Sequence, residues 1–245
     1  MTRRASRVPR PAQMADRYLR TDRILRHVLV GPAIRLISRL EVEGHDFVPA
    51  NGAVIVAANH LSAMDAVVLP LAVGRPVTFL GKAEYFEMPG IKGKIVASFM
   101  ERIGTIPVDR AGGRAAVLSL EAAQQALRDE RAFAIHPEGT RSPDGRLYRG
   151  KTGAARLALS TNTPVLPCGI IGTDRLHPVG NRLPRPARVI VRFGPLIYPA
   201  SYISGSMAVR SRELTEHMMS AIASLTGQKM VDRFSPGPAH RPPHR

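Results

Sequence analysis

Cysteine and tryptophan are nearly missing from this sequence of 245 residues, which has one cysteine and no tryptophan. The lone Cys168 excludes an intrachain disulfide, as is typical of proteins that are kept in a reducing compartment. It stands in the apolar run Pro-Cys-Gly-Ile-Ile, without a base that accompanies it in the pattern. This setting favours a buried thiol over a nucleophile.

Long hydrophobic runs are missing as well. The longest, such as residues 66–74, are about half as long as the roughly 18–20 apolar residues that a membrane-spanning helix needs. The basic N-terminus is not followed by the apolar block of a secretory signal peptide. We therefore expect a cytoplasmic protein, either free or held peripherally at the cytoplasmic face of the cell membrane.

Acidic residues are scarce, with 19 Asp and Glu against 35 Lys and Arg, which gives a formal net charge of +16. Residues 1–40 hold ten arginines and two aspartates, so this stretch alone carries 10 − 2 = +8. Such a segment favours an anionic partner, and composition leaves a lipid surface, a nucleic acid and acidic ligands open. Aromatic residues make up only 5% of the chain, and no DNA- or RNA-reading motif is recognisable. A nucleic-acid partner is therefore not expected, although a basic nucleic-acid-binding protein stays the alternative of a different class.

Apolar runs that alternate with amphipathic stretches predict an α/β fold. The expected strands cover 53–58, 77–80, 104–108, 132–135, 164–171 and 189–193, and the expected helices cover 63–73, 91–100, 113–129, 151–160 and 206–226. Because the strands are apolar without alternation, we expect one domain with a single, largely parallel sheet that helices flank on both faces. In such sheets, functional residues gather in the loops that follow the carboxyl ends of the strands.

The two ends of the chain differ from this body. Residues 1–13 form a basic arm broken by prolines, and residues 231–245 are a Pro-rich tail, so we expect both to be disordered. Residues 14–40 interleave apolar positions with arginines in a helical pattern, which Gly31-Pro32 should divide into two amphipathic helices. This pair lies either in a membrane interface, which we favour, or on the core with a solvated basic face. The folded domain is then expected at 41–230.

The strongest local pattern is Asn59-His60 followed by Asp65, directly after the strand expected at 53–58. A carboxylate on one imidazole nitrogen fixes the tautomer and leaves the other nitrogen free to take a proton from a hydroxyl. His60 and Asp65 are therefore candidate catalytic residues, with His60 as general base. The alternative is that His60 caps the next helix and Asp65 merely favours its first turn, and the pattern alone leaves both open.

A second polar cluster, Pro137-Glu-Gly-Thr-Arg-Ser142, follows the strand expected at 132–135. Gly139 permits the close approach of a ligand, while Arg141 offers a planar fork for a phosphate and Thr140 adds a hydroxyl. Glu138 either orients the arginine or binds hydroxyl groups of an acceptor. The alternative is a polar turn with a surface ion pair, which would contribute little.

Four blocks of the sequence, taken in order, resemble the motifs of the glycerolphosphate acyltransferase family, in particular of the 1-acyl-glycerol-3-phosphate acyltransferases. The blocks are Asn59-His60-x4-Asp65, Gly104-x5-Arg110, Pro137–Ser142 and, more loosely, Pro164-Val-Leu-Pro167. Lys82 and Glu84 are further matches. The resemblance runs from about residue 40 to about residue 200, and four blocks in this order are highly specific. It implies that 41–230 is an acyltransferase domain.

The resemblance further implies a direct transfer in which His60, held by Asp65, deprotonates an acceptor hydroxyl that attacks the thioester of acyl-CoA or acyl-carrier protein. No cofactor, metal or covalent acyl-enzyme is needed. Lysophosphatidate is the expected acceptor, giving phosphatidate in phospholipid biosynthesis, with glycerol 3-phosphate, other lysophospholipids and glycolipids as alternatives. The substrate-binding residues that it implies are Asn59, Lys82, Arg110, Glu138, Gly139, Thr140 and Arg141. The expected partners are thus acyl-CoA, a lysophospholipid and, through residues 1–40, an anionic membrane surface; the oligomeric state stays open.

Two positions depart from the family pattern. His136 stands where a Phe or another apolar residue is usual, and Pro107 stands where an aromatic or aliphatic residue is frequent. We interpret His136 as a tolerated substitution, with an added hydrogen-bond donor near the phosphate as the alternative. Pro107 could alter the fit of the acceptor or of the acyl chain.

Overall fold

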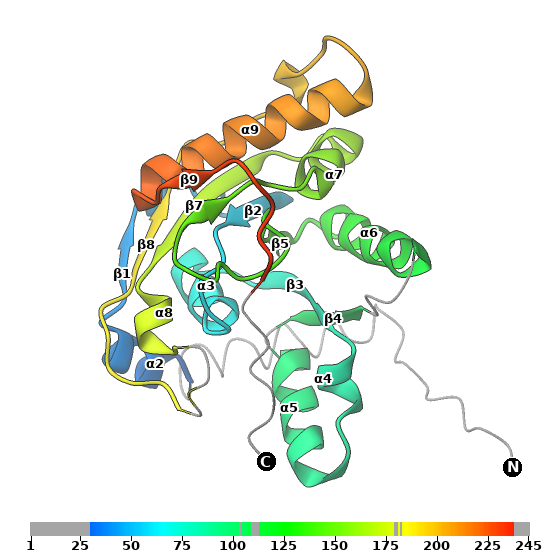
Figure 1. Ribbon diagram of the computed structural model, residues 1–245. Coiled ribbons are helices and arrows are strands. Elements are labelled where there is room, and N and C mark those ends of the chain that lie inside the picture. Colours follow the sequence, from blue (N-terminus) through cyan, green and yellow to red (C-terminus); the bar gives the residue numbers. More distant parts are fainter. Residues whose placement is uncertain (1–29, 103, 109–112, 179–180, 182, 238–245) are drawn as a thin grey trace, which may run out of the picture.

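The computed structural model describes residues 30–102, 104–108, 113–178, 181 and 183–237. Strands and helices alternate along it as the sequence predicts (Figure 1). The strands are β1 (Glu41–Glu43), β2 (Val54–Ala58), β3 (Val77–Lys82), β4 (Thr105–Val108), β5 (Ala132–Ile135), β6 (Leu147–Tyr148), β7 (Val165–Ile171), β8 (Ile190–Phe193) and β9 (Met230–Val231). The helices are α2 (Val30–Ser38), η2 (His45–Phe47), α3 (Asp65–Val73), α4 (Glu84–Glu87), α5 (Gly90–Arg102), α6 (Gly113–Arg128), α7 (Gly153–Thr161), α8 (Thr173–Leu176), η3 (Pro199–Ser201) and α9 (Met207–Thr226).

The main sheet of the described residues has the strand order β1-β8-β7-β2-β5-β3-β4. Its neighbouring strands are parallel except for β7 and β8, which are antiparallel. β8 and β1 therefore run opposite to the rest of the sheet. The α/β fold with a largely parallel sheet and flanking helices is confirmed, and the sheet is mixed at one edge.

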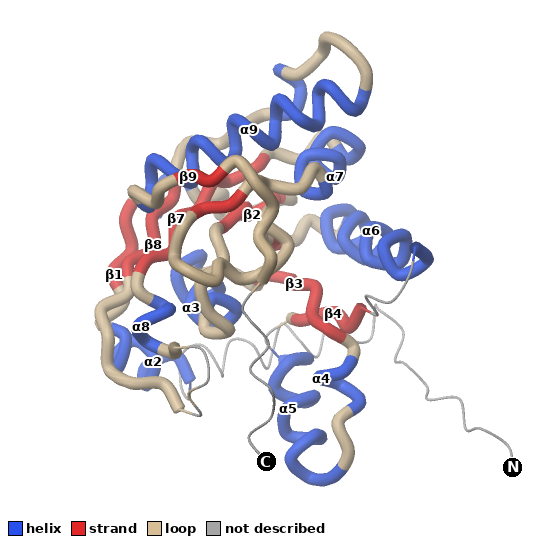
Figure 2. Tube along the Cα trace, viewed as in Figure 1, coloured by secondary structure: helices blue, strands red, loops and turns tan. Residues whose placement is uncertain are grey.

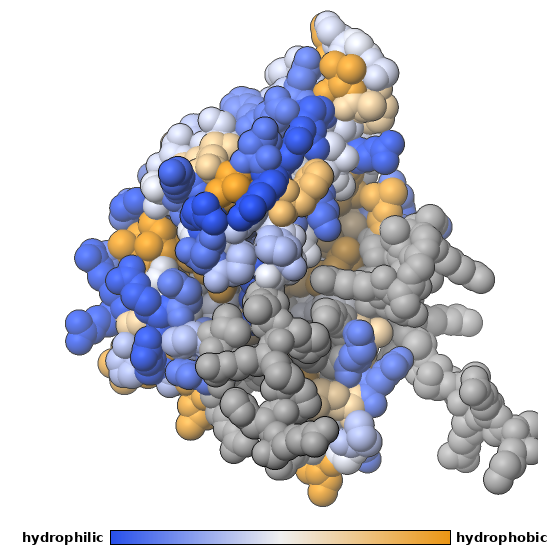
Figure 3. All heavy atoms as spheres, viewed as in Figure 1, coloured by the Kyte–Doolittle hydropathy of each residue, from blue (hydrophilic) through white to orange (hydrophobic). Residues whose placement is uncertain are grey.

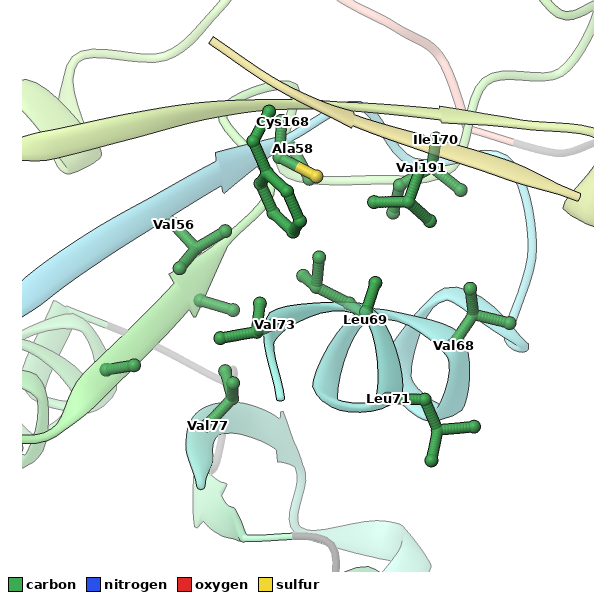
Figure 4. Close-up of a cluster of buried hydrophobic side chains, with 14 of the residues drawn as sticks. Val56, Ala58, Val68, Leu69, Leu71, Val73, Val77, Cys168, Ile170 and Val191 are labelled. Atoms are coloured by element: carbon green, nitrogen blue, oxygen red, sulfur yellow. The ribbon is translucent and has the colours of Figure 1, made fainter. Parts of the chain in front are cut away.

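Both faces of the sheet are buried beneath helices (Figure 2). Val54, Val56 and Ala58 of β2 join one apolar cluster with residues of α2, α3 and α8, whereas Ile55 and Ala57 join a second with residues of α6, α7 and α9. This follows from the period of two in a strand, which sends successive side chains to opposite faces. In Figure 4, Val56 and side chains of β7 face Leu69 of α3. β2 is thus anchored on both sides, and it holds the loop that follows it in a fixed position.

The first described helix, α2, is part of the core rather than a separate attachment. Ile34 of α2 is buried among residues of the first cluster, and Ile37 packs against the same cluster. Gly31 and Pro32 lie within α2, next to its first described residue, Val30. The expected arm at 1–13 and the first helix of the expected pair lie outside the described residues.

The C-terminal segment continues on the core beyond the expected domain end at residue 230. Met230–Val231 forms β9, which pairs in parallel with β6, and the Arg149 N–H donates to the carbonyl of Arg233. In Figure 1 this segment runs across the front of the sheet edge. The expected boundary at 231 therefore falls within a strand, and residues 238–245 lie outside the described part.

The surface of the described residues carries apolar side chains in separate patches. Figure 3 shows a largely hydrophilic surface around α9 with small apolar areas between. Leu36 of α2 and Ile91 and Ile95 of α5 are 80%, 78% and 64% exposed. Among the described helices, none has the length and hydropathy to cross a bilayer.

Candidate active site

Two loops at the carboxyl edge of the sheet bring the predicted site residues together. β2 and β5 are parallel neighbours, with Ala57 level with Ile135. Asn59-His60 continues β2 and His136-Pro137 continues β5, so both polar segments leave the sheet side by side. A hydrogen bond from the Ser142 N–H to the His60 carbonyl, 2.8 Å long, ties the two loops together.

His60 and Asp65 form the pair that the sequence predicts. Nδ1 of His60 lies 2.7 Å from Oδ2 of Asp65, and the side chains are 22% and 0% exposed. Because β2 ends at Ala58 and α3 begins at Asp65, the intervening turn folds the carboxylate back beneath the ring. One nitrogen of His60 is thus occupied, and the partly exposed ring has a second nitrogen with which to take a proton.

The Asp65 carboxylate is held by hydrogen bonds on both oxygens. Oδ2 also accepts from the N–H groups of Leu61 and Ser62 at 2.8 and 2.9 Å, and Oδ1 accepts from the Thr173 hydroxyl at 2.5 Å. Burial alone would raise the pKa of Asp65, but the hydrogen bond and the charge of His60 and the donor at Ser62 outweigh it and leave the pKa below its ordinary value. The ionised carboxylate therefore keeps the proton of His60 on Nδ1 and leaves Nε2 as the basic nitrogen.

Glu138 is buried beneath the loops, with 1% exposure. Its Oε2 accepts from the His60 N–H at 3.1 Å and its Oε1 from the Tyr148 N–H at 2.9 Å. Burial raises the pKa of Glu138 to about 7, although these two donors lower it. The carboxylate joins the backbone of the His60 loop to that of β6.

Asn59 is also buried, and its side-chain amide bonds to a neighbouring strand. Oδ1 accepts from the Ile170 N–H at 2.7 Å, while Nδ2 donates to the Ile170 carbonyl at 2.8 Å and to Oε1 of Gln228 at 2.9 Å. Asn59 therefore continues the β2–β7 ladder through its side chain at the point where the backbone of β2 leaves the sheet. Gln228 connects the C-terminal segment to the same loop.

The three residues that follow Glu138 also have exposed surface at this edge. Gly139 is exposed and has a φ of +76°, and Thr140 and Arg141 are half-buried. A Cβ at Gly139 would lie 3.1 Å from Nζ of Lys151, so the absence of a side chain at Gly139 allows the lysine to pack close to the turn. Within the described part of the chain, no carboxylate pairs with the guanidinium of Arg141. Gly139, Thr140, Arg141 and the neighbouring Lys151 thus form a basic rim beside His60, and this rim is available to an anionic ligand.

The remaining predicted binding residues are less fully described. Lys82 is the last residue of β3, and its backbone pairs with that of Val108 in β4, at the same carboxyl edge of the sheet. Arg110 lies outside the described residues. Pro107 sits in β4, at the edge of the described sheet, where its lack of an N–H is tolerated.

Thr173 and Gln228 contribute to the site although the sequence analysis does not single them out, and His136, interpreted there as a tolerated substitution, contacts His60 directly. Thr173 follows β7, the neighbour of β2, so the rule that placed His60 at a strand end could have found it. Gln228 reaches Asn59 from a distant segment, and no local pattern announces it. His136 lies with its ring stacked on that of His60, the centroids 3.9 Å apart and the planes 5° from parallel.

Attack by a thiol and binding of a metal ion have little support among the described residues. Cys168 is buried in the first apolar cluster, and burial raises the pKa of its thiol well above the ordinary value, which disfavours a nucleophilic role. The described residues contain no group of three or more His, Cys, Asp or Glu side chains that could hold a metal ion.

Comparison with known proteins places the chain in one group. A family model described as Acyltransferase matches residues 39–171. A chloroplastic 1-acyl-sn-glycerol-3-phosphate acyltransferase of Arabidopsis thaliana is 31% identical over 144 residues, covering 58% of this chain and 39% of the relative. A 1-acyl-sn-glycerol-3-phosphate acyltransferase of Borreliella burgdorferi is 29% identical over 136 residues, covering 56% and 52%. The matched part thus spans about half or less of the length of these two relatives.

A solved structure has a similar fold. The crystal structure of the 1-acyl-sn-glycerophosphate acyltransferase of Thermotoga maritima superposes with a TM-score of 0.62 at 27% identity, covering 87% of this chain and 83% of the other. The superposition therefore reaches well beyond the residues that the family model matches.

Proposed function

Since the chain belongs to the acyltransferase family, we propose that it transfers a fatty acyl group from acyl-CoA or acyl-carrier protein to the free hydroxyl of a lysophosphatidate-type acceptor. The product is phosphatidate, an intermediate of phospholipid biosynthesis. The observation that carries the proposal is the 2.7 Å contact between Nδ1 of His60 and Asp65, beside a basic rim that has no carboxylate partner among the described residues. The names of the relatives support the choice of acceptor.

The chemistry needs one base and no covalent intermediate. Nε2 of His60 takes the proton of the acceptor hydroxyl, and the oxygen attacks the carbonyl carbon of the thioester. The tetrahedral intermediate collapses with cleavage of the C–S bond, and the leaving thiolate takes the proton back from the imidazolium. Asp65 stabilises that imidazolium and holds its tautomer throughout.

The basic rim is proposed to bind the phosphate of the acceptor. The Arg141 guanidinium can bind two phosphate oxygens, while Thr140 adds a hydroxyl and Gly139 permits close approach of the phosphate to the backbone. Lys82 and Arg110 complete the proposed set. For Asn59 and Glu138, whose polar atoms are engaged with protein groups, we propose that they act by holding the His60 loop in place.

The acceptor belongs to a membrane, so the protein is proposed to act as a peripheral enzyme at an anionic surface on the cytoplasmic side of the membrane. Residues 1–29 hold eight arginines and two aspartates, which is a charge of 8 − 2 = +6, and exposed Leu36 follows them. Each basic residue near an anionic surface contributes about 1 kcal/mol. Because α2 is part of the core, the test should delete residues 2–29 and keep α2. We expect the deletion variant to remain in the supernatant with anionic vesicles that sediment the full chain, and equal sedimentation of both would refute the dock.

The function is tested by thiol release from palmitoyl-CoA with purified protein. Lysophosphatidate, glycerol 3-phosphate and no acceptor are offered in parallel to the wild type and to His60→Ala. Release that requires lysophosphatidate and is lost in His60→Ala supports the proposal. Release with glycerol 3-phosphate alone would change the acceptor and keep the mechanism. If neither supports release, carrier-protein donors and other lysolipids follow, and failure of all of them would refute the acyltransferase assignment of His60.

Binding to nucleic acid is the alternative from a different class, and the net charge of +16 is the observation behind it. It is tested with the same protein by adding duplex DNA and anionic vesicles separately at increasing salt. Salt-sensitive binding to vesicles without binding to DNA favours the enzyme.

A further inference from the structure

His136 stacks face to face on the proposed base. The ring centroids of His60 and His136 are 3.9 Å apart with an interplanar angle of 5°. The register of the sheet explains the contact, since Ala57 is level with Ile135 and the residue after Ile135 therefore reaches the end of β2.

His136 is itself fixed by hydrogen bonds to the segment that carries His60. Its Nδ1 lies 3.0 Å from the carbonyl oxygens of both Ala58 and Asn59. Because carbonyl oxygens only accept, Nδ1 of His136 carries the proton and donates it. Burial, together with the charge of the neighbouring His60, lowers the pKa of His136 to about 3, so the ring is neutral near pH 7.

A neutral His136 has no second N–H to give. The sequence leaves open a hydrogen-bond donor near the phosphate at this position, but the single ring N–H is engaged with the backbone carbonyls of Ala58 and Asn59. A neutral ring also suits its neighbour, because His60 becomes an imidazolium during the proposed reaction and a second positive ring 3.9 Å away would oppose that charge.

The two contacts of His60 restrain different movements of its ring. Asp65 holds one edge through Nδ1, which still permits the ring plane to tilt about that contact. His136 covers one face and opposes this tilt. Restraint of both the edge and the face of the ring would keep Nε2 of His60 pointing in one direction. This matters because a misplacement of about 1 Å in a reacting group can lower the rate by about a hundredfold.

We propose that His136 is a positioning residue that sets the ring plane of His60 by stacking. The inference rests on the proposed function, because it assigns to His136 a role in the same proton transfer. It acts through His60 and needs only the flat face of the ring, while the hydrogen bonds to Ala58 and Asn59 hold His136 itself.

Three variants separate the ring from its hydrogen bonds. His136→Phe keeps an aromatic face without the N–H donor, His136→Asn keeps a donor without the face, and His136→Ala removes both. With lysophosphatidate varied at saturating palmitoyl-CoA, we expect His136→Ala and His136→Asn to lose about ten- to a hundredfold in kcat, with KM for the acceptor within about twofold. His136→Phe should recover most of the lost kcat. A kcat of His136→Ala within twofold of wild type would overturn the proposal, as would recovery by Asn rather than Phe.

A spectroscopic measurement tests the stack without relying on turnover. The imidazole C–H protons of His60, assigned by their loss in His60→Ala, should carry a ring-current shift in the wild type that persists in His136→Phe and disappears in His136→Ala. An unchanged shift in His136→Ala would refute the stack in solution. Failure of the proposed function would look different, because the wild type itself would then release no acceptor-dependent thiol.

Discussion

Two carboxylates are buried at the site, that of Asp65 at the start of α3 and that of Glu138 in the loop after β5, and their pKa values are shifted in opposite directions. Asp65 is 0% exposed and Glu138 is 1% exposed, and each accepts backbone N–H groups. Asp65 also has an imidazole and a hydroxyl as partners, and its pKa is lowered. Among the described residues, Glu138 accepts from two backbone N–H groups, and its pKa is raised to about 7.

The difference shows that burial does not by itself decide the charge of a carboxylate. A cationic or ionisable partner at hydrogen-bonding distance can outweigh desolvation, whereas two neutral N–H groups do not. Asp65 is therefore suited to the stabilisation of an imidazolium, and Glu138 to the joining of backbone segments. Substitutions at Asp65 and at Glu138 test this difference directly, and a substitution at Gln228 tests the support around them.

The largest effect is expected for Asp65→Asn. The amide keeps the size of the carboxylate but no longer stabilises the imidazolium or enforces the proton on Nδ1 of His60, so kcat for acyl transfer should fall by about 10³–10⁴. Asp144→Asn is the matched control, because Asp144 is an exposed carboxylate that pairs with Arg146 at the surface. Its kcat should stay within a few fold of wild type, and comparable losses in the two variants would remove the special role of Asp65.

Glu138→Ala is expected mainly to lower the free energy of unfolding. It leaves the N–H groups of His60 and Tyr148 without an acceptor in a buried place, at a cost of about 1–3 kcal/mol for each. Urea unfolding measures the loss, with Glu138→Gln as the conservative comparison because its side-chain oxygen can still accept one of the two bonds. An unfolding free energy of Glu138→Ala equal to that of wild type would show that water replaces the carboxylate without penalty.

The pH dependence of stability should have opposite signs for the two groups. The pKa of Glu138 rises from 4.5 to about 7 on folding, so the folded state holds a proton that the unfolded state has lost, and this contribution to stability declines as the pH rises from about 4.5 to about 7. The decline is on the order of 3 kcal/mol. The lowered pKa of Asp65 works the other way, since its contribution is present above the ordinary aspartate pKa and is lost as the pH falls below it.

Unfolding free energies of the wild type and Glu138→Gln between pH 4.5 and 7.5 check this prediction. The excess stability of the wild type over the variant should decline by this amount, because an amide does not titrate and the opposing contribution of His136, whose pKa is lowered to about 3, is common to both proteins. Parallel curves for the two proteins would mean that Glu138 keeps an ordinary pKa in the folded state.

The comparison also explains which parts of the site could be predicted from the sequence. His60, Asp65 and Arg141 follow expected strands within a few residues, and their proposed roles depend on chemistry that a local pattern contains. The expected strands and long helices match the observed ones to within about two residues at most ends, because apolar runs of that length have few alternatives.

What the sequence does not contain is the set of contacts between distant segments. The pattern could not tell that Glu138 turns inward to the His60 N–H, nor that His136 stacks on His60, since both depend on the registry of β2 with β5. The short elements β6 and β9 exist only because they pair with each other, and two residues are too few to give a periodicity. The antiparallel direction of β8 could not be predicted either, because the apolar pattern of a strand does not give its direction in the sheet.

The smallest effect is expected where the C-terminal segment touches the His60 loop. Gln228→Ala removes the acceptor of one Asn59 N–H and the donor to the Gly145 carbonyl, but Asn59 keeps both bonds to Ile170. We expect a loss of about 1 kcal/mol in urea unfolding. Asn59→Ala, which also strands the N–H and the carbonyl of Ile170 in the core, should lose more. If Gln228→Ala cost as much as Asn59→Ala, the segment that contains β9 would have to be counted as part of the support of His60, with the same weight as β7.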